Sequence, residues 1–268
     1  MIFIVFILIL NLSNSFVFQK NIFSRKIYIA SHLEHDVEAK TILSQPEGYG
    51  FISTLSRKKK TFHFPHSSLV GFSIDDTGNP FFAFSTLSFH TRNLILNNSA
   101  SLCVPDYGFK NGADARVSLT GLVDKVYDES KSLALKNLYK NSHPHADWIF
   151  LPDFSIYKMN KILDISFVGG FKRAGPISIE KYYSARPDPL IFKIKDYIEI
   201  LNDNYLSYLI EKLDNNFDFG KKENIIIKNL DCNGINFRTN KGIVRLNFKT
   251  KIKSFNELIE KINKDLFY

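Results

Sequence analysis

The segment Phe81–Leu94 constrains the fold of this chain more than any other part of the sequence. Its first four residues are aromatic or small and apolar, which is typical of a buried strand. Hydroxyl residues follow, and an amphipathic helix then begins near Phe89. Ser85 and Ser88 suit the N-cap and first turn of that helix, because their hydroxyls can accept hydrogen bonds from free backbone N–H groups. The positive end of the helix dipole lies at the same point, so the junction is either a simple cap or an anion-binding cradle.

The composition is that of a globular protein with a moderate excess of positive charge. The 268 residues have room for one large domain or two smaller ones, and a hydrophobic content of 44% excludes a disordered chain. A formal charge of +8 alone would suit a nucleic acid or another anionic partner. The lysines are dispersed, however, and the one tight basic cluster, Arg57–Lys60, lies between two strand-like runs. We therefore expect an exposed hairpin tip there and no nucleic-acid partner.

The cysteines and histidines do not form a recognisable metal-binding motif. Cys103 and Cys232 are far apart in strand-like contexts, and their spacing provides neither a disulfide framework nor a set of metal ligands. The closely spaced histidines at 63 and 66, and at 143 and 145, have prolines beside them. Prolines favour turn or surface positions, so we expect no metal site.

The N-terminus is typical of a targeting sequence. Ile2–Leu10 is an uninterrupted apolar run with the length of a signal-peptide core, too short to span a bilayer. Small residues precede a plausible cut after Ser15, and residues 16–33 are basic, hydroxyl-bearing and free of acids, as in a transit peptide. A signal peptide at 1–15 and a transit segment at 16–33 predict a plastid protein without a transmembrane segment in the mature chain. Secretion is the alternative.

Short strand-like runs separated by turn signals dominate residues 35–182. Strands are predicted at 49–55, 68–74, 81–84, 101–104, 116–126, 154–159 and 162–170, and helices at 35–44 and 128–141. Because the helices occur singly between strands, a small antiparallel barrel fits this order better than a parallel, doubly wound sheet.

The pattern changes after a proline-containing linker at 183–191. Beyond it, a helix is predicted at 192–213, strands at 225–230, 234–239 and 243–248, and a second helix at 255–266. Residues 192–268 are therefore expected to form an α-β-β-β-α domain. The predicted fold class of the whole chain is α+β.

Seven short motifs occur in an order that is found in one known family. They are GFISTL at 50–55, PHSSLV at 65–70, DTGNP at 76–80, STLSFHTRNL at 85–94, ASL at 100–102, ARVSLTG at 115–121 and FVGGFKRA at 167–174. Together they resemble the pyridoxamine 5′-phosphate oxidase-like split barrel, in the branch of haem-utilisation oxygenases and glutamyl-tRNA reductase-binding proteins. The C-terminal unit is similar to the accessory domain that is common in that branch.

This resemblance implies a homodimer of two barrels, with FMN or haem bound in a cleft between them. Matched by position, Thr54 and Ser56 would line the cleft, and Ser85, Ser88, His90, Thr91 and Asn93 would form its anion-facing rim. Arg116 and Arg173 would supply positive charge to a phosphate or a propionate. The redox chemistry would belong to the cofactor, and the protein would supply position and electrostatics.

The chain departs from the family pattern in the accessory domain. Relatives with haem activity carry two histidines in its first helix, whereas Ile200–Tyr205 contains none here, and no histidine follows His145. The missing imidazole argues against haem oxygenase chemistry. No nucleophile–base or paired-carboxylate arrangement can be picked out, so the sequence does not decide between an enzyme and a regulator. We expect a plastid regulator of tetrapyrrole metabolism that binds glutamyl-tRNA reductase, and the alternative is an FMN-dependent oxidoreductase.

Overall fold

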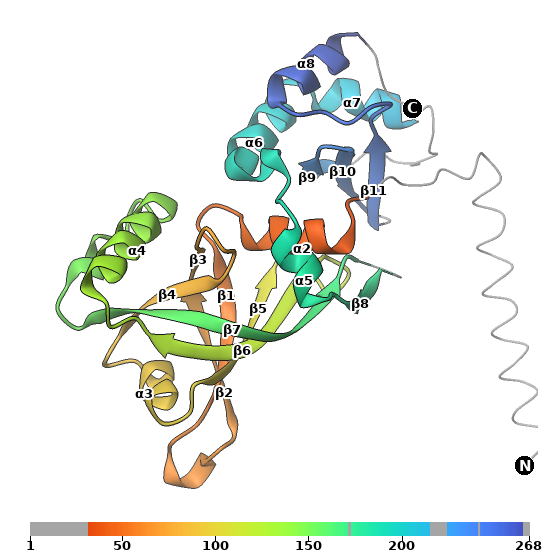
Figure 1. Cartoon of the computed structure of the whole chain (residues 1–268). Helices are drawn as coiled ribbons and strands as arrows, with labels where there is room; N and C mark the ends of the chain where they lie inside the picture. The colour runs from red at the N-terminus through yellow and green to blue at the C-terminus, as the bar shows by residue number, and fades with distance from the viewer. Residues whose placement is uncertain (1–31, 171–172, 215–223, 241, 265–268) are drawn as a thin grey trace, which may run out of the picture.

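The computed structural model describes residues 32–170, 173–214, 224–240 and 242–264. The predicted signal peptide and nearly all of the predicted transit segment lie outside these residues. Figure 1 shows a large, curled sheet that carries helices at its ends, and a smaller sheet covered by helices on one side. Within the described part of the chain, no helix has the length and apolar character needed to cross a bilayer.

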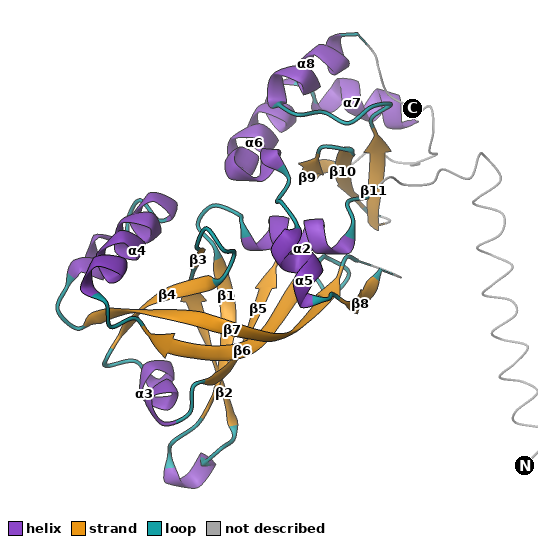
Figure 2. Cartoon of the chain, in the orientation of Figure 1, coloured by secondary structure: helices purple, strands orange, loops and turns teal. Residues whose placement is uncertain are grey.

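The larger unit is an antiparallel sheet that curls without closing (Figure 2). Its elements are α2 (His35–Leu43), β1 (Tyr49–Leu55), η1 (Lys59–Thr61), β2 (Pro65–Gly71), β3 (Ser73–Ile74), β4 (Pro80–Ser85), α3 (Phe89–Leu96), β5 (Ser99–Pro105), β6 (Arg116–Lys125), α4 (Glu129–Ser142), η2 (Asp147–Phe150), β7 (Phe154–Val168), β8 (Ala174–Pro176) and α5 (Ile179–Ser184). The strand order is β2-β1-β5-β6-β7-β4-β3, with β8 paired to β7. Since β2 and β3 are the two edges, the barrel is split, as the sequence predicted.

The burial of each strand explains its pattern of apolar and polar residues. In β1, Gly50, Ile52 and Thr54 are buried and alternate with exposed or half-buried residues. Strand β4 is different, because all of its residues are buried. Phe82 and Phe84 belong to the barrel core, whereas Phe81 and Ala83 pack with residues of α4 and η2. A continuous apolar run is therefore required in β4, and α4 covers its outer face.

Strands β6 and β7 form the long ladder that supports the barrel. Two register shifts bend it, one of them between Thr120 and Gly121. A Cβ atom at Gly121 would lie 2.2 Å from the Lys161 carbonyl oxygen, so this close approach of two backbones requires glycine. The predicted break between strands at 159 and 162 is wrong, because β7 continues through it. The polar residues there lie at the bend and not in a turn.

The smaller unit has a three-stranded antiparallel sheet in the order β11-β10-β9. Its elements are η3 (Pro189–Lys193), α6 (Ile194–Asn204), α7 (Leu206–Asp214), β9 (Ile226–Asp231), β10 (Gly234–Thr239), β11 (Gly242–Asn247) and α8 (Phe255–Asn263). Leu201, Leu209, Phe237 and Leu258 are fully buried in its own hydrophobic core. The predicted single helix at 192–213 is wrong, since a 3-10 turn and a break at Tyr205 divide it into three pieces.

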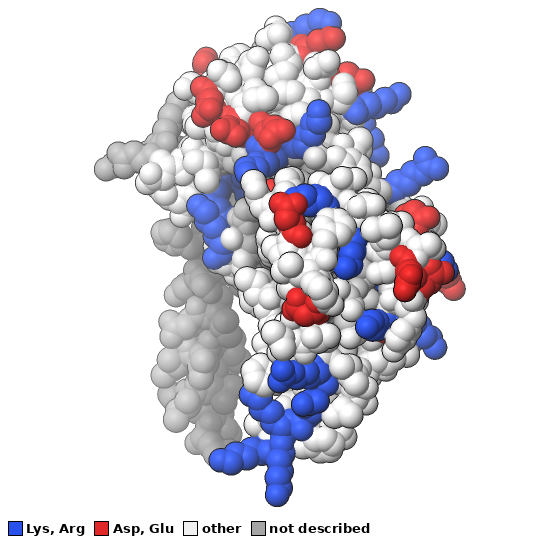
Figure 3. Space-filling model, turned by 90° about the vertical axis from the view of Figure 1, so that its left-hand side faces the viewer, with Lys and Arg blue, Asp and Glu red and all other residues white. Residues whose placement is uncertain are grey.

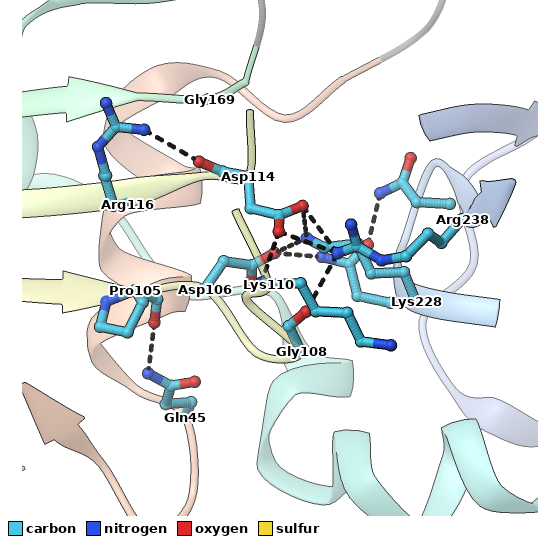
Figure 4. Close-up of polar contacts among 12 residues, drawn as sticks. Gln45, Pro105, Asp106, Gly108, Lys110, Asp114, Arg116, Gly169, Lys228 and Arg238 are labelled. Atoms are coloured by element: carbon cyan, nitrogen blue, oxygen red, sulfur yellow. Dashed lines mark hydrogen bonds and ion pairs between the residues drawn. The ribbon is translucent and has the colours of Figure 1, made fainter. Parts of the chain in front are cut away.

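A buried group of charges joins the two units (Figure 4). Asp106 and Asp114, in the β5–β6 connection, face Lys228 and Arg238 of the small sheet. The Lys228 ammonium lies 2.6 Å from an Asp106 oxygen, and one Arg238 nitrogen donates to both Asp114 oxygens at 2.9 Å. The Asp114 side chain is fully buried. Burial opposes its ionisation, but backbone N–H groups and Arg238 hold the pKa of Asp114 below its usual range. These contacts fix the small unit against the barrel.

Candidate functional site

A half-open cavity of about 270 Å³ lies between strands β1, β2 and β4 and the α4–η2 segment. This volume is just below the range of about 300–1,000 Å³ that is typical of small-molecule sites. The lining residues are Glu47, Tyr49, Leu69, Val70, Gly71, Ala83, Phe84, Ser85, Ser88, His90, Tyr139, His143, Pro144, His145, Ala146, Trp148 and Phe154. Among the described residues, the wall is therefore aromatic, aliphatic and imidazole-bearing, with one carboxylate and no lysine or arginine.

Tyr139, on the last turn of α4, and His143, directly after that helix, form a rigid part of this wall. Their rings stack 4.3 Å apart, and His143 Nε2 lies 2.9 Å from the Phe72 carbonyl oxygen. Because a carbonyl only accepts, Nε2 is the protonated nitrogen, and burial lowers the pKa of His143 so that the ring is neutral. A Cβ atom at Gly71 would lie 2.3 Å from the Tyr139 hydroxyl, so this glycine makes room for the stack.

His90, in the first turn of α3, is the second imidazole of the wall. Its ring is tilted against Phe84 at a centroid distance of 4.3 Å. Burial, together with the charge of His66, lowers the pKa of His90 to about 4, so the ring is neutral at physiological pH. It makes no hydrogen bond with any described residue. A neutral imidazole of this kind can offer a nitrogen to a metal or to a ligand donor.

The two serines at the start of α3 also line the cavity, but not as predicted caps. Ser88 occupies the N-cap position, yet its hydroxyl accepts no capping hydrogen bond. The Ser85 hydroxyl donates to an Asp153 oxygen at 2.6 Å and accepts from the Leu87 N–H at 3.1 Å. The predicted hydroxyl cap is therefore wrong. An anion bound at this point would face the Asp153 carboxylate, which opposes the cradle interpretation.

Four further residues of the predicted site lie beside the cavity, away from its wall. The Asn93 amide donates to Thr54 Oγ1 at 3.0 Å and accepts from the Arg57 N–H at 3.1 Å, which ties α3 to β1 and to the hairpin beyond it. Ser56 Oγ lies 2.9 Å from Thr61 Oγ1 within that hairpin. Thr91 is fully buried, and its hydroxyl is without a partner among the described residues. A ligand contact for these residues stays a prediction.

The two predicted arginines lie in a different part of the barrel. Ser85 pairs with Phe154 at one end of β7, whereas Arg116 pairs with Val168 at the other end. Arg116 donates to the carbonyl oxygens of residues 112 and 114, near the small unit (Figure 4). Arg173 forms an ion pair with Glu38 of α2 at 2.6 Å. Within this chain, the structure does not bring them together with the cavity, and their ligand roles stay predictions.

Comparison with known proteins agrees with this architecture. The family described as "CREG, beta-barrel" matches residues 31–184, which is more than half of the chain. The chain belongs to the CREG β-barrel family. The cavity of this CREG-family protein lies within the matched region. The split-barrel resemblance that the seven motifs indicated is thereby confirmed.

One sequence relative of the CREG-family chain and one solved structure with the same fold carry names that refer to haem. The chloroplastic non-canonical haem oxygenase HOZ of Arabidopsis thaliana is 30% identical over 161 residues, which cover 58% of this chain and 48% of HOZ. The chain thus spans about half the length of this curated relative. A solved haem-binding protein from Mycobacterium smegmatis shares the fold with a TM-score of 0.60 and 22% identity, over 87% of this chain and 96% of that one.

The sequence reasoning missed the contribution of the α4–η2 segment to the site of this CREG-family protein. Tyr139 was not singled out in the helix predicted at 128–141, and the histidines at 143 and 145 were assigned to turn or surface positions. Their spacing carries no signal for a cavity, because only the packing of α4 across β4 brings them near His90. The continuous apolar run of β4 was the one signal in the sequence, because such a strand must be packed on both faces and therefore needs an element outside the barrel.

Proposed function

We propose that this protein binds a haem-type tetrapyrrole in the cavity and acts in tetrapyrrole metabolism. The observation that carries this proposal is the neutral, unbonded imidazole of His90 in an aromatic wall. Haem needs an apolar surface for its macrocycle and a nitrogen, sulfur or oxygen donor for its iron. His90 would supply the donor, and Phe84, Tyr49 and Trp148 would contact the macrocycle. The haem-related names of HOZ and of the mycobacterial protein support the ligand class.

The lining suits haem better than FMN. The FMN phosphate needs cationic or multiple N–H donors, and among the described residues the cavity wall has no lysine or arginine. Arg116 and Arg173 are engaged with backbone carbonyls and with Glu38. Bound haem would supply a redox-active iron, while this chain would exclude water from one macrocycle face and fix its orientation. Since the cavity is half open, part of the haem would extend beyond its open side, where a second protein surface could cover it.

An optical titration tests the proposal. Purified protein titrated with haem should develop a shifted Soret band that saturates at one haem per chain. His90→Asn should shift that spectrum and weaken binding, because it removes the donor nitrogen. His63→Asn, at a hairpin position with positive φ that asparagine tolerates, is the matched control and should behave as wild type. Stoichiometric FMN in the purified protein, with turnover of a substrate, would instead favour an FMN-dependent oxidoreductase.

We also propose that the protein acts as a regulator in a plastid and binds glutamyl-tRNA reductase. The leader-like N-terminus and the chloroplastic relative support the compartment. The absence of a nucleophile–base arrangement in the sequence favours binding over independent catalysis. A fluorescent fusion to the first 40 residues should enter plastids. The mature protein should retain the reductase in a pull-down and leave haem intact, and degradation of haem without reductase binding would reject the regulatory role.

We propose that the protein forms a homodimer through the outer face of β1 and β2. Phe51 and Leu69 are cross-strand partners on this face and are 52% and 64% exposed. Leu69 also lines the cavity, so a second copy covering it would close the open side. Sedimentation should give twice the monomer mass. Leu69→Lys should give monomers that bind haem more weakly, whereas Leu133→Lys, at an exposed leucine of α4, should leave the dimer intact.

A further inference from the structure

The connection between β1 and β2 carries an exposed group of basic and aromatic side chains. We define this hairpin tip as Arg57, Lys58, Lys59, Lys60, Phe62 and Phe64. All six are exposed, and the two phenylalanines expose 55% and 66% of their surface. Figure 1 shows that the hairpin projects beyond the body of the barrel, at the end opposite to the small unit. The tip is therefore convex and accessible.

Acidic residues are absent from the sequence segments around the hairpin tip, so they do not weaken its positive potential. The sequence has no Asp or Glu between Glu47 and Asp75, and none between Asp76 and Asp106. Both segments meet at this end of the barrel, where α3 packs beside the hairpin. Figure 3 shows basic side chains and no acidic ones at the lower end of the molecule, where Figure 1 places the hairpin. An anionic partner would meet little repulsion there.

The hairpin tip is held in a fixed conformation. The Ser56 N–H donates to the Phe64 carbonyl and the His63 N–H donates to the Ser56 carbonyl, both at 2.8 Å. The Lys58 ammonium lies 3.9 Å from the centre of the Phe89 ring, which joins the tip to α3. A fixed tip presents its charges and aromatic rings together, so little conformational entropy is lost on docking.

We propose that the hairpin tip docks the protein onto an anionic lipid bilayer. The cations would lie at the lipid phosphates, and Phe62 and Phe64 would enter the boundary between headgroups and acyl chains. A convex tip suits a broad, soft surface of this kind. Proteins that bind single-stranded nucleic acid use a groove with aromatic platforms, which is not the shape of this tip. The docked surface is separate from the cavity, so both can be occupied at once.

Vesicle flotation tests this inference with the full-length mature protein. Wild type should bind vesicles of equal parts phosphatidylcholine and phosphatidylglycerol, and binding should weaken with salt and disappear on pure phosphatidylcholine. Replacing Lys58, Lys59 and Lys60 by Gln should weaken binding about hundredfold. The double change Phe62→Ser and Phe64→Ser should weaken it about tenfold. The matched control replaces Lys131, Lys161 and Lys181 by Gln, which removes the same charge elsewhere and should bind as wild type.

Four results would overturn the inference. Equal loss of binding in the control triple variant would show that net charge alone drives adsorption. Binding of wild type to pure phosphatidylcholine, or undiminished binding of the lysine variant, would show that the tip cations are not used. If the tip variants sediment more slowly than wild type while their vesicle binding is unchanged, the tip forms a contact between two copies of the protein. Each variant is first compared with wild type by thermal unfolding.

Discussion

His90 couples the chemistry of the cavity to the pH dependence of folding. The pKa of His90 is lowered to about 4, whereas an unfolded histidine titrates near 6.5. Between these pH values the unfolded chain binds the additional proton, so stability is complete above about 6.5 and is lost as the pH falls toward 4. His90→Asn should reduce this slope by less than about 1 kcal/mol per pH unit, since the ring is partly open to solvent.

Chemical denaturation of wild type and His90→Asn at several pH values between about 7 and 5 measures this effect. Some slope will persist in the variant, because burial also lowers the pKa values of His32 and His143. An identical slope in the two proteins would mean that His90 is not shielded from solvent in the way the structure shows.

At the residue scale, the cavity wall contains three of the residues expected at a site, and their ligand contacts stay predictions. Ser85 and Ser88 were expected because a strand followed directly by a helix places them at one junction. His90 was expected from the family resemblance. Their hydrogen bonds were not predictable, since Asp153 comes from a distant segment that β4–β7 pairing brings beside Ser85. Arg173 was assigned to a ligand from its motif, but its ion pair with Glu38 depends on how α2 lies against the barrel.

At the element scale, the bend of the β6–β7 ladder gives a stability prediction. Gly121→Ala places a Cβ against the Lys161 carbonyl oxygen, and the backbone has to shift. We expect a loss of about 1–3 kcal/mol in the free energy of unfolding. Gly175→Ala is the matched control, because nothing lies within 4 Å of its Cβ, and it should stay within about 0.5 kcal/mol of wild type. Urea denaturation compares the three proteins, and equal stability of both variants would contradict the close approach.

The same bend shows which bounds of helices and strands could not be predicted from the sequence. Period-2 patterns predicted β1 without error and most other strands to within a few residues. The break predicted inside β7 arose because polar residues at a bulge look like a turn. In the segment 192–213, apolar residues recur at helical spacing on both sides of Tyr205, and this pattern predicted one continuous helix. Strand β8 and α5 are too short to show a period.

At the scale of the whole molecule, the charges in Figure 4 hold the small unit on the barrel. Lys228→Met leaves Asp106 buried without its cation, which should lower the free energy of unfolding by about 3–5 kcal/mol. The matched control is Lys140→Met, since the Lys140–Asp147 pair is far more exposed and should contribute less than about 1 kcal/mol. Guanidinium denaturation measures both, and a small effect of Lys228→Met would mean that the Lys228–Asp106 ion pair contributes little to holding the two units together.

The central claim is that the cavity at α3 and α4 receives the haem. Ser88→Trp tests it most directly, because Ser88 lines the cavity and its hydroxyl makes no capping bond that the change would remove. The neighbouring Leu87 is 70% exposed and lies outside the lining, so Leu87→Trp is the matched control. In a Soret titration, Ser88→Trp should weaken haem binding about tenfold or more, and Leu87→Trp should match wild type. Equal haem affinity in all three proteins would contradict the account.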